Sequence, residues 1–141
     1  MIRCAAMDIE PPSNTGEIRP AHRLDEVRLA AWLQANIAGF GGPLTIRQFR
    51  GGQSNPTFWF TDGARQWVLR KKPPGTLLPS AHAVEREHRV MSALRDTAVP
   101  VPRVYACCED PAVIGTPFFV MEHVVGRILW DVRLPDSNPV E

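Results

Sequence analysis

The sequence has few cysteines, no long apolar run and almost no net charge. Its three cysteines are Cys4, Cys107 and Cys108, and an odd number with an adjacent pair does not form a disulfide framework. No Cys-x-x-Cys pair occurs and the four histidines are scattered, so no zinc-binding spacing is present. No apolar run approaches the roughly 20 residues that span a bilayer, and the N-terminus lacks a signal-peptide core. These absences predict a cytoplasmic protein without a membrane partner or a metal site.

The charge balance argues against a nucleic-acid-binding domain. The net charge is +1 and the isoelectric point is about 7.8, whereas duplex-binding domains usually carry a basic stripe and a high isoelectric point. The 141 residues suffice for one small domain, and 44% of them are hydrophobic, which is enough to bury a core. The composition therefore predicts a globular domain and disfavours a nucleic acid as its partner without excluding one.

The N-terminal part predicts a flexible leader and then a helix. Residues 1–22 are interrupted by proline, glycine, serine and asparagine, which break any periodicity. Residues 23–40 show helical spacing, with Asp25 and Glu26 suited to the first turn and Gly39 suited to the end. The face expected to be buried comprises Val27, Ala30, Trp32, Leu33 and Ile37.

Strand signals follow this helix. Residues 44–52 and the two β-favouring runs within 57–71 predict three strands, the last two joined at Asp62-Gly63 as a hairpin. Residues 81–96 return to helical spacing, with Ser80 as the expected N-cap, and the rest of the chain adds two more strands, at 99–110 and 118–125. The order predicts an α+β domain with a five-stranded antiparallel sheet, one packed helix and an extra N-terminal helix.

Strand alternation divides the stretch "RQWVLRKK" between two faces. Side chains alternate across a strand, so we expect Trp67 and Leu69 to enter the core, and Val68 and Arg70 to face a cleft. The two lysines that end the run are expected in solvent.

Glu87 interrupts the apolar stripe of the second helix. It shares this stripe with Val84 and Met91, and a carboxylate facing a core is costly unless it is paired. Either the helix is rotated and Glu87 lies at its rim, or Glu87 holds a cation of the sheet, for which Arg70 is the candidate. Glu85 lies off the stripe and is expected in solvent.

Two further segments have the composition of a binding site. Gly51 and Gly52 permit close backbone approach, and Ser54 and Asn55 add short donors, as in a loop that cradles an anion; an ordinary hairpin has the same composition. The apolar run "FFVMEHVVG" ends in a connector whose backbone groups could bind a planar ring, or it is a core strand followed by a turn.

Taken in order, these segments resemble the small lobe of protein-kinase-like enzymes. The closer resemblance is to the aminoglycoside phosphotransferase family, also called the phosphotransferase enzyme family, and within it to the domain fused to acyl-CoA dehydrogenases in larger proteins. The resemblance covers about residues 41–130 and implies a kinase-like N-lobe at 41–124, then a connector and the start of a truncated C-lobe at 125–141. It is carried by "GGQSNPTF", "WVLRKKPPGTLLPSAHAVEREHRVMSAL", "VPVPRVYACCED" and "VIGTPFFVMEHVVG".

The resemblance implies a site for ATP with Mg²⁺. Arg70 stands where the general kinase pattern has lysine, and Arg and Lys are not interchangeable. Glu87 would orient this cation, and the backbone carbonyl of Glu122 and N–H of Val124 would hold the adenine edge. Pro56 stiffens the exit of the glycine loop and removes a backbone donor. The remaining implied contacts are Gly51, Gly52, Ser54 and Asn55 with the phosphates, and Val68 and Met121 with the adenine.

The family's catalytic motifs do not occur in these residues. The large lobe of the family carries His-Gly-Asp-x-x-x-x-Asn and a later Asp-x-Glu for the metal, and the chain has neither. The sequence therefore predicts an inactive, ATP-binding fragment with no catalytic or metal residue. Complete relatives would transfer the γ-phosphoryl to a small-molecule hydroxyl.

Two other interpretations remain open. The chain could be a non-catalytic interaction module that pairs with itself or with a separately encoded large lobe. It could also bind single-stranded nucleic acid by stacking bases on aromatic side chains beside cations. The residues for that second interpretation are Phe58, Trp59 and Phe60 with Arg65, Arg70, Lys71 and Lys72.

Overall fold

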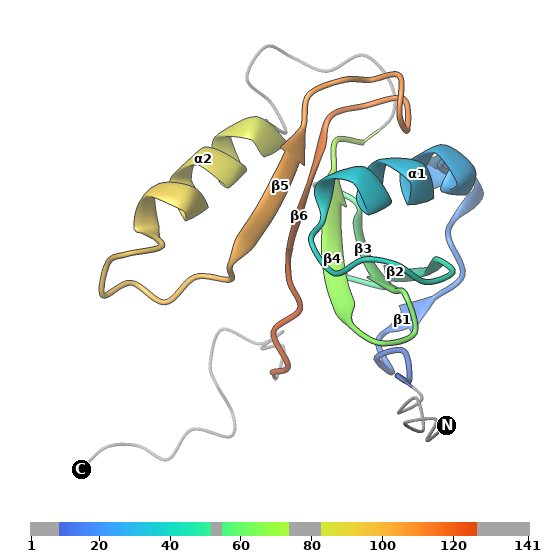
Figure 1. Ribbon diagram of the computed structural model, residues 1–141, viewed down its shortest axis with the longest axis horizontal. Helices are drawn as coiled ribbons and strands as arrows, with labels where there is room; N and C mark the ends of the chain where they lie inside the picture. Colours follow the sequence, from blue (N-terminus) through green and yellow to red (C-terminus); the bar gives the residue numbers. More distant parts are fainter. Residues whose placement is uncertain (1–8, 52–54, 74–82, 127–141) are drawn as a thin grey trace.

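The computed structural model describes residues 9–51, 55–73 and 83–126, which form a six-stranded antiparallel sheet with two α-helices (Figure 1). The strand order is β1-β2-β3-β4-β6-β5, so β4 lies inside the sheet, between β3 and β6. The predicted α+β class and antiparallel sheet are confirmed. The elements are β1 (Thr15–Gly16), the 3₁₀ turn η1 (Pro20–His22), α1 (Glu26–Asn36), β2 (Thr45–Phe49), β3 (Thr57–Thr61), β4 (Gln66–Lys71), α2 (Val84–Leu94), β5 (Val104–Cys108) and β6 (Phe118–Glu122).

The sixth strand comes from the segment expected to be a flexible leader. Thr15 pairs with Phe49, and Gly16 pairs with Gln48, which adds β1 to the edge of β2. The Thr15 hydroxyl donates to the Pro12 carbonyl at 2.6 Å, and Thr15 is only 2% exposed. A two-residue strand is too short for alternation to reveal it, so the sequence predicted five strands instead of six.

The β3–β4 hairpin is closed by a four-residue loop at 62–65, because Thr61 pairs with Gln66. Gly63 has φ 94°, the left-handed conformation expected of the Asp-Gly dipeptide. Asp62 Oδ1 accepts from the backbone N–H groups of Ala64 at 2.9 Å and Arg65 at 2.8 Å. Burial alone would raise the pKa of Asp62, but these backbone bonds more than offset it and hold the pKa below its usual value.

Helix α1 begins at Asp25, whose side chain accepts from the Arg28 N–H at 3.0 Å, as an N-cap does. Leu33 and Ile37 are buried as expected. Leu29, which was not expected, is also fully buried, whereas Val27 is 82% exposed, because it lies about 200° around the helix from Leu29. The core therefore forms between this face of α1 and the β3, β4 and β6 side chains.

The two helices lie on opposite faces of the sheet. In β6, Phe118 packs edge-on against Trp32 of α1, with ring centroids 4.9 Å apart. The next residue, Phe119, contacts His88 of α2 at 5.9 Å. Since consecutive strand residues point to opposite faces, α1 covers the core side and α2 covers the other. Helix α2 begins at Val84, later than predicted, and the expected N-cap Ser80 lies outside the described residues.

Candidate functional site

Strand β4 separates core residues from site residues as its alternation predicts. Trp67 and Leu69 belong to the core cluster on the α1 side. Val68 and Arg70 point to the α2 side, where each lines a pocket. Because β4 is paired along its length with both β3 and β6, the two site residues stand on a fixed part of the scaffold.

The prediction that the lysines after Arg70 lie in solvent is wrong. Lys71 is still paired with Phe118 of β6, is only 4% exposed, and places its Nζ 5.8 Å from the Phe58 ring centre. This burial lowers the pKa of Lys71. Lys72 Nζ lies 2.9 Å from Glu85 Oε1, and both side chains are about three-quarters buried, so Glu85 is not a solvated residue either.

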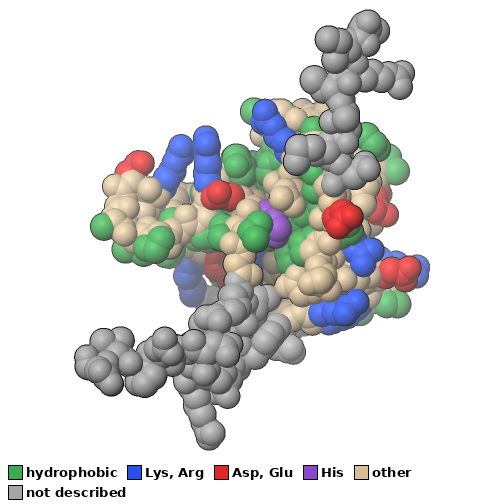
Figure 2. All heavy atoms as spheres, turned by 90° about the horizontal axis from the view of Figure 1, so that it is seen from below, with side chains coloured by type: hydrophobic (Ala, Val, Ile, Leu, Met, Phe, Trp, Pro, Cys, Tyr) green, Lys and Arg blue, Asp and Glu red, His purple; other side chains and the backbone are tan. Residues whose placement is uncertain are grey.

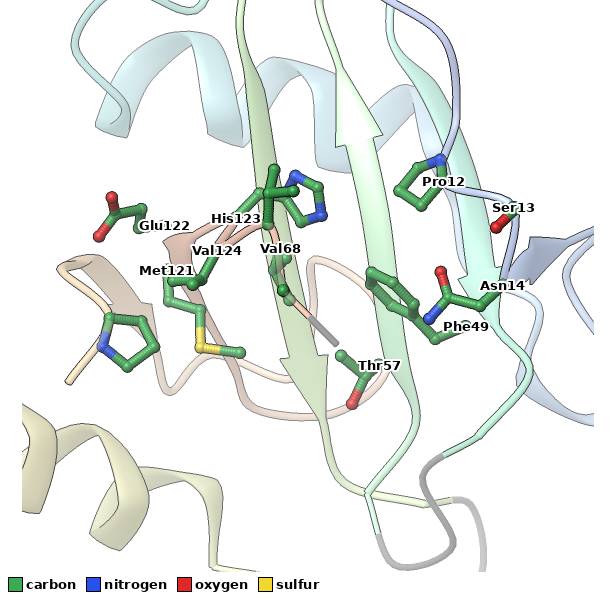
Figure 3. A pocket seen from close by; sticks show the side chains of 13 residues that line it. Pro12, Ser13, Asn14, Phe49, Thr57, Val68, Met121, Glu122, His123 and Val124 are labelled. Atoms are coloured by element: carbon green, nitrogen blue, oxygen red, sulfur yellow. The ribbon is translucent and has the colours of Figure 1, made fainter. Parts of the chain in front are cut away.

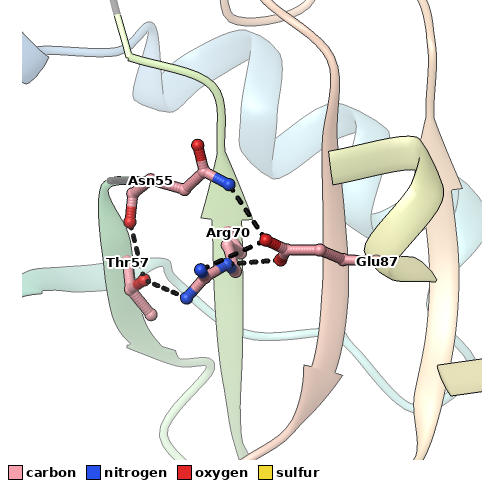
Figure 4. Close-up of polar contacts among 4 residues, drawn as sticks. All are labelled: Asn55, Thr57, Arg70 and Glu87. Atoms are coloured by element: carbon pink, nitrogen blue, oxygen red, sulfur yellow. Dashed lines mark hydrogen bonds and ion pairs between the residues drawn. The ribbon is translucent and has the colours of Figure 1, made fainter. Parts of the chain in front are cut away.

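Arg70 and Glu87 form an ion pair that joins the sheet to α2 (Figure 4). Arg70 Nη2 donates to Glu87 Oε1 at 3.2 Å, and Arg70 Nε lies 2.6 Å from Glu87 Oε2 as an ion pair, so the guanidinium contacts both oxygens of the carboxylate. Arg70 Nη1 also donates to the Thr57 hydroxyl at 3.4 Å. Of the two interpretations of Glu87, the structure therefore supports the one in which it holds the cation of the sheet.

Asn55 belongs to this cluster and not to an open loop. It is 2% exposed, and its Nδ2 donates to Glu87 Oε1 at 3.1 Å. Its carbonyl accepts from the Thr57 hydroxyl at 3.1 Å. Gly51 lies two residues after the end of β2, whereas Gly52 and Ser54 lie outside the described residues. The phosphate contacts expected of this loop therefore stay a prediction, and the Asn55 side chain serves to hold Glu87.

A pocket of about 450 Å³ opens on the same face of the sheet (Figure 3). This volume lies within the range of about 300–1,000 Å³ that is usual for small-molecule sites. Val68 of β4 and Thr57 of β3 line it beside Met121 of β6, and Thr57 connects it to Arg70 through the bond described above. The other residues that line it are Pro12, Ser13, Asn14, Phe49, Pro102, Glu122, His123, Val124, Val125 and Gly126.

The connector after β6 presents polar atoms to this pocket. Among the described residues, the Val124 N–H makes no backbone hydrogen bond, and the residue is 59% exposed. His123 packs its ring 6.3 Å from that of Phe49, and its Nδ1 is buried without a hydrogen-bond partner in the described part of the chain. Burial lowers the pKa of His123, which favours the neutral ring. The sequence did not single out His123, Phe49 or Thr57.

A second pocket of about 470 Å³ lies between α2 and the sheet. Its walls are mostly apolar, with Val90 and Met91 from the helix facing Phe119 and Met121 from β6. Arg70 and Glu87 line its end, and Met121 also lines the first pocket. The ion pair thus lines the second cavity and is linked to the first through Thr57.

The aromatic run proposed to stack on nucleic-acid bases cannot do so. Phe58, Trp59 and Phe60 are each 0% exposed, so no base can reach their faces. On the face seen from below, basic and acidic side chains are interspersed and no stripe of one sign is visible (Figure 2). These two observations remove the basis of the nucleic-acid interpretation.

Neither a metal-binding cluster nor a membrane-spanning helix occurs among the described residues. Within ranges 9–51, 55–73 and 83–126, no three histidine, cysteine, aspartate or glutamate side chains come together in a way that could hold a metal ion. Over the same ranges, no helix has the length and apolar character needed to cross a membrane.

Comparisons with known proteins show which proteins this chain resembles. The sequence profile of the phosphotransferase enzyme family matches residues 45–140. Acyl-CoA dehydrogenase family member 11 of Homo sapiens is 47% identical over 133 residues, which is 92% of this chain and 17% of that protein. The corresponding protein of Rattus norvegicus is 45% identical over 139 residues, which is 96% of this chain and 18% of the relative. A probable acyl-CoA dehydrogenase of Arabidopsis thaliana, IBR3, is 48% identical and covers 90% of this chain and 17% of its own length.

A solved structure shares the fold as well as the sequence. It is a protein of Ralstonia eutropha JMP134, provisionally named an aminoglycoside phosphotransferase, with 48% identity and a TM-score of 0.69. The match covers 83% of this chain and 33% of that protein. The chain thus spans less than a fifth of the curated relatives and a third of the solved one, and its sheet and helices match a kinase-like small lobe. By its sequence match over residues 45–140 and by this shared fold, the chain belongs to the phosphotransferase enzyme family.

Proposed function

We propose that this chain is the ATP-binding lobe of a kinase-like phosphotransferase. The observation that carries the proposal is the Arg70–Glu87 ion pair, which lies next to a pocket of nucleotide size and is joined to it through Thr57. A fixed cation beside such a pocket suits a phosphate chain, because phosphoryl transfer depends mainly on positioning and on electrostatic stabilisation.

The proposal places the parts of ATP as follows. The adenine lies against Val68 and Met121, with its polar edge on the carbonyl of Glu122 and the N–H of Val124. That N–H is available as a donor, since no described backbone group accepts from it. The phosphates then extend past Thr57 towards Arg70.

Glu87 serves to orient the cation. A guanidinium has five donors, of which Nε and Nη2 face Glu87 and Nη1 faces Thr57. The carboxylate therefore fixes one edge of Arg70 and leaves its remaining donors for phosphate oxygens. Magnesium, which the family generally uses, would shield the phosphates, but the described residues supply no ligand cluster for it, so we assign it to no residue of this chain.

The proposal includes a limit on activity. These 141 residues contain no His-Gly-Asp motif, so we propose that alone they bind ATP but do not transfer its γ-phosphoryl group to a small-molecule hydroxyl. Complete relatives would carry out that transfer with a large lobe. The acceptor is not assigned by anything in this lobe.

Ligand-observed NMR with ATP tests the binding. Saturation transfer from the 141-residue chain to the adenine protons is expected, with a loss of affinity in Arg70→Ala. No transfer to ATP at millimolar concentration would reject the proposal. If the pure chain hydrolyses ATP or phosphorylates an added alcohol in the presence of magnesium, the proposal that it is inactive alone is rejected.

A second candidate function is that of an interaction module. The apolar pocket beside α2 favours it, because Val90 is 50% exposed there and the connector carries Val125 at 84% exposure. Such a surface could be covered by a second copy or by a separate large lobe. A monomeric elution volume at every concentration tested by size-exclusion chromatography would count against self-association.

A further inference from the structure

The segment before β1 forms one wall of the proposed nucleotide pocket. Pro12, Ser13 and Asn14 line this pocket, and Figure 3 shows them beyond Phe49, on the side away from Glu122. The family match begins only at residue 45, so this wall lies outside the region that the family profile describes. The match to the rat relative covers 96% of the chain and so extends well before residue 45.

Hydrogen bonds to β2 hold this wall in place. The Arg50 N–H donates to the Asn14 carbonyl at 2.9 Å, and the Thr15 N–H and hydroxyl both donate to the Pro12 carbonyl, at 3.1 and 2.6 Å. Arg47 Nη2 donates to the Thr15 carbonyl at 3.2 Å. The chain just after β1 is fastened as well, because the Arg19 N–H donates to the side chain of Gln48 at 2.9 Å. The turn at 12–14 is therefore a fixed part of the pocket.

This wall brings an unused polar group into the pocket. Among the described residues, the half-buried Asn14 side chain has no hydrogen-bond partner, although its amide can both donate and accept. His123 Nδ1, which lines the same pocket, is likewise buried without a partner in the described chain. A buried polar atom without a partner, such as His123 Nδ1, is rare and calls for an explanation. A bound ligand with hydroxyl groups supplies one, and the partly exposed Asn14 amide could bind the same ligand.

We propose that the turn at 12–14 recognises the ribose of the bound nucleotide, with the Asn14 amide hydrogen-bonded to a ribose hydroxyl. The inference rests on the proposed function. With the adenine edge at Glu122 and Val124, the sugar faces the opposite wall, where Phe49 supplies an apolar surface and Asn14 supplies the polar group. His123 lies in the connector between Glu122 and Val124, with its ring 6.3 Å from that of Phe49, and offers Nδ1 as a second partner. A hydroxyl suits both groups, since it donates and accepts at once.

The test compares ATP, 2′-deoxy-ATP and 3′-deoxy-ATP on the 141-residue chain by ligand-observed NMR titration. Asn14→Ala is expected to weaken ATP binding by about threefold to tenfold, the value of one net hydrogen bond. It is also expected to reduce saturation transfer to the ribose protons relative to the adenine protons. The analogue that lacks the recognised hydroxyl should bind the unmodified chain as weakly as ATP binds the Asn14→Ala variant. For that analogue, Asn14→Ala should cause no further loss of affinity.

Asn36→Ala is the matched control. It makes the same chemical change at an exposed position of α1, where Asn36 Nδ2 donates only to the Trp32 carbonyl, and it should leave all three affinities unchanged. Asn14→Ser keeps a short hydrogen-bonding group and should retain part of the preference. Thermal unfolding by circular dichroism checks that the variants fold.

The outcomes separate this inference from the proposed function. If ATP binds and Asn14→Ala behaves like Asn36→Ala, the wall does not read the ribose, while ATP binding stands. Equal binding of ATP and both deoxy analogues to the unmodified chain overturns the inference without any variant. If the unmodified chain shows no transfer to ATP, the proposed function fails and the inference fails with it.

Discussion

Arg70 Nε lies 2.6 Å from Glu87 Oε2, and the other oxygen of the same carboxylate accepts from both Arg70 and Asn55. This carboxylate therefore connects β4, α2 and the segment before β3. A few residues along the helix, Glu85 makes a similar pair with Lys72, at 2.9 Å. Two glutamates of one helix thus hold two cations at one strand end. The Arg70–Glu87 pair lines the pocket beside α2 and reaches the first pocket through Thr57.

Replacing Glu87 is the first prediction. Glu87→Ala should weaken ATP binding by about threefold to tenfold, because Arg70 loses the group that orients it, a charge-assisted interaction reduced here by partial exposure to solvent. Isothermal titration calorimetry or NMR titration measures the affinity. Glu85→Ala is the control, since it breaks an ion pair on the same helix and Glu85 lines neither the pocket beside Arg70 nor the proposed nucleotide pocket. Equal losses in both variants would mean that the effect comes from the position of α2 and not from Arg70.

Replacing Arg70 by lysine is the second prediction. Lysine has no planar fork, so it cannot contact both Glu87 oxygens and Thr57 as Arg70 does. Arg70→Lys should bind ATP more weakly than the unmodified chain but more tightly than Arg70→Ala, since it keeps the charge. A titration series with the three proteins decides the order. If lysine restores full affinity, the guanidinium geometry has no role in binding and only its charge matters.

Much of this site could be predicted because it depends on alternation and on helical spacing. The division of Trp67 and Leu69 from Val68 and Arg70 follows from the two faces of a strand. Glu87 stood out because it is a carboxylate on an apolar stripe, and the structure gives it the partner expected. Such patterns are local, so they survive without knowledge of the tertiary structure.

Other features depend on register and on distant pairing. A two-residue turn at Asp62-Gly63 would not place Thr57 opposite Arg70; the four-residue loop does. The turn at 12–14 enters the pocket only because β1 pairs with β2, more than 30 residues later in the sequence. The sequence predicted that Lys71 lies in solvent, because it does not show that the pairing of β4 with β6 extends as far as Lys71. These contacts arise from the folded sheet and leave no local signal.

The burial of Lys71 gives the third prediction. The pKa of Lys71 is lowered by burial, so between its folded pKa and its unfolded value near 10.5 the unfolded state binds more protons. Stability should therefore rise with pH across this window, and the cost of the buried charge should be constant below it. Lys71→Met keeps a similar volume and removes the charge. It should raise the melting temperature at pH 7 and abolish this rise at alkaline pH.

Lys72→Met is the control for that measurement. Lys72 is paired with Glu85, so removing its charge breaks an ion pair and should not raise the melting temperature. Differential scanning fluorimetry from pH 7 to 10.5 follows both variants. A lower melting temperature for Lys71→Met at pH 7 would show that its charge stabilises the fold, against the direction given by its burial.

The fourth prediction concerns two adjacent glycines that hold the β3–β4 loop. A Cβ at Gly42 would overlap the carbonyl oxygen of Asp62 and crowd its carbonyl carbon, 2.9 Å away, whereas a Cβ at Gly41 would meet nothing within 4 Å. The Gly41 N–H donates to Asp62 Oδ2 at 3.2 Å, and alanine at position 41 would keep this bond.

Gly42→Ala should therefore lower the free energy of unfolding by about 1–3 kcal/mol, the usual cost of overpacking a fixed site. Gly41→Ala should change it little, because it adds the same methyl group to open space. Urea unfolding of both variants measures the difference, and similar losses in the two would show that chain stiffness at this point, and not contact with Asp62, decides the effect.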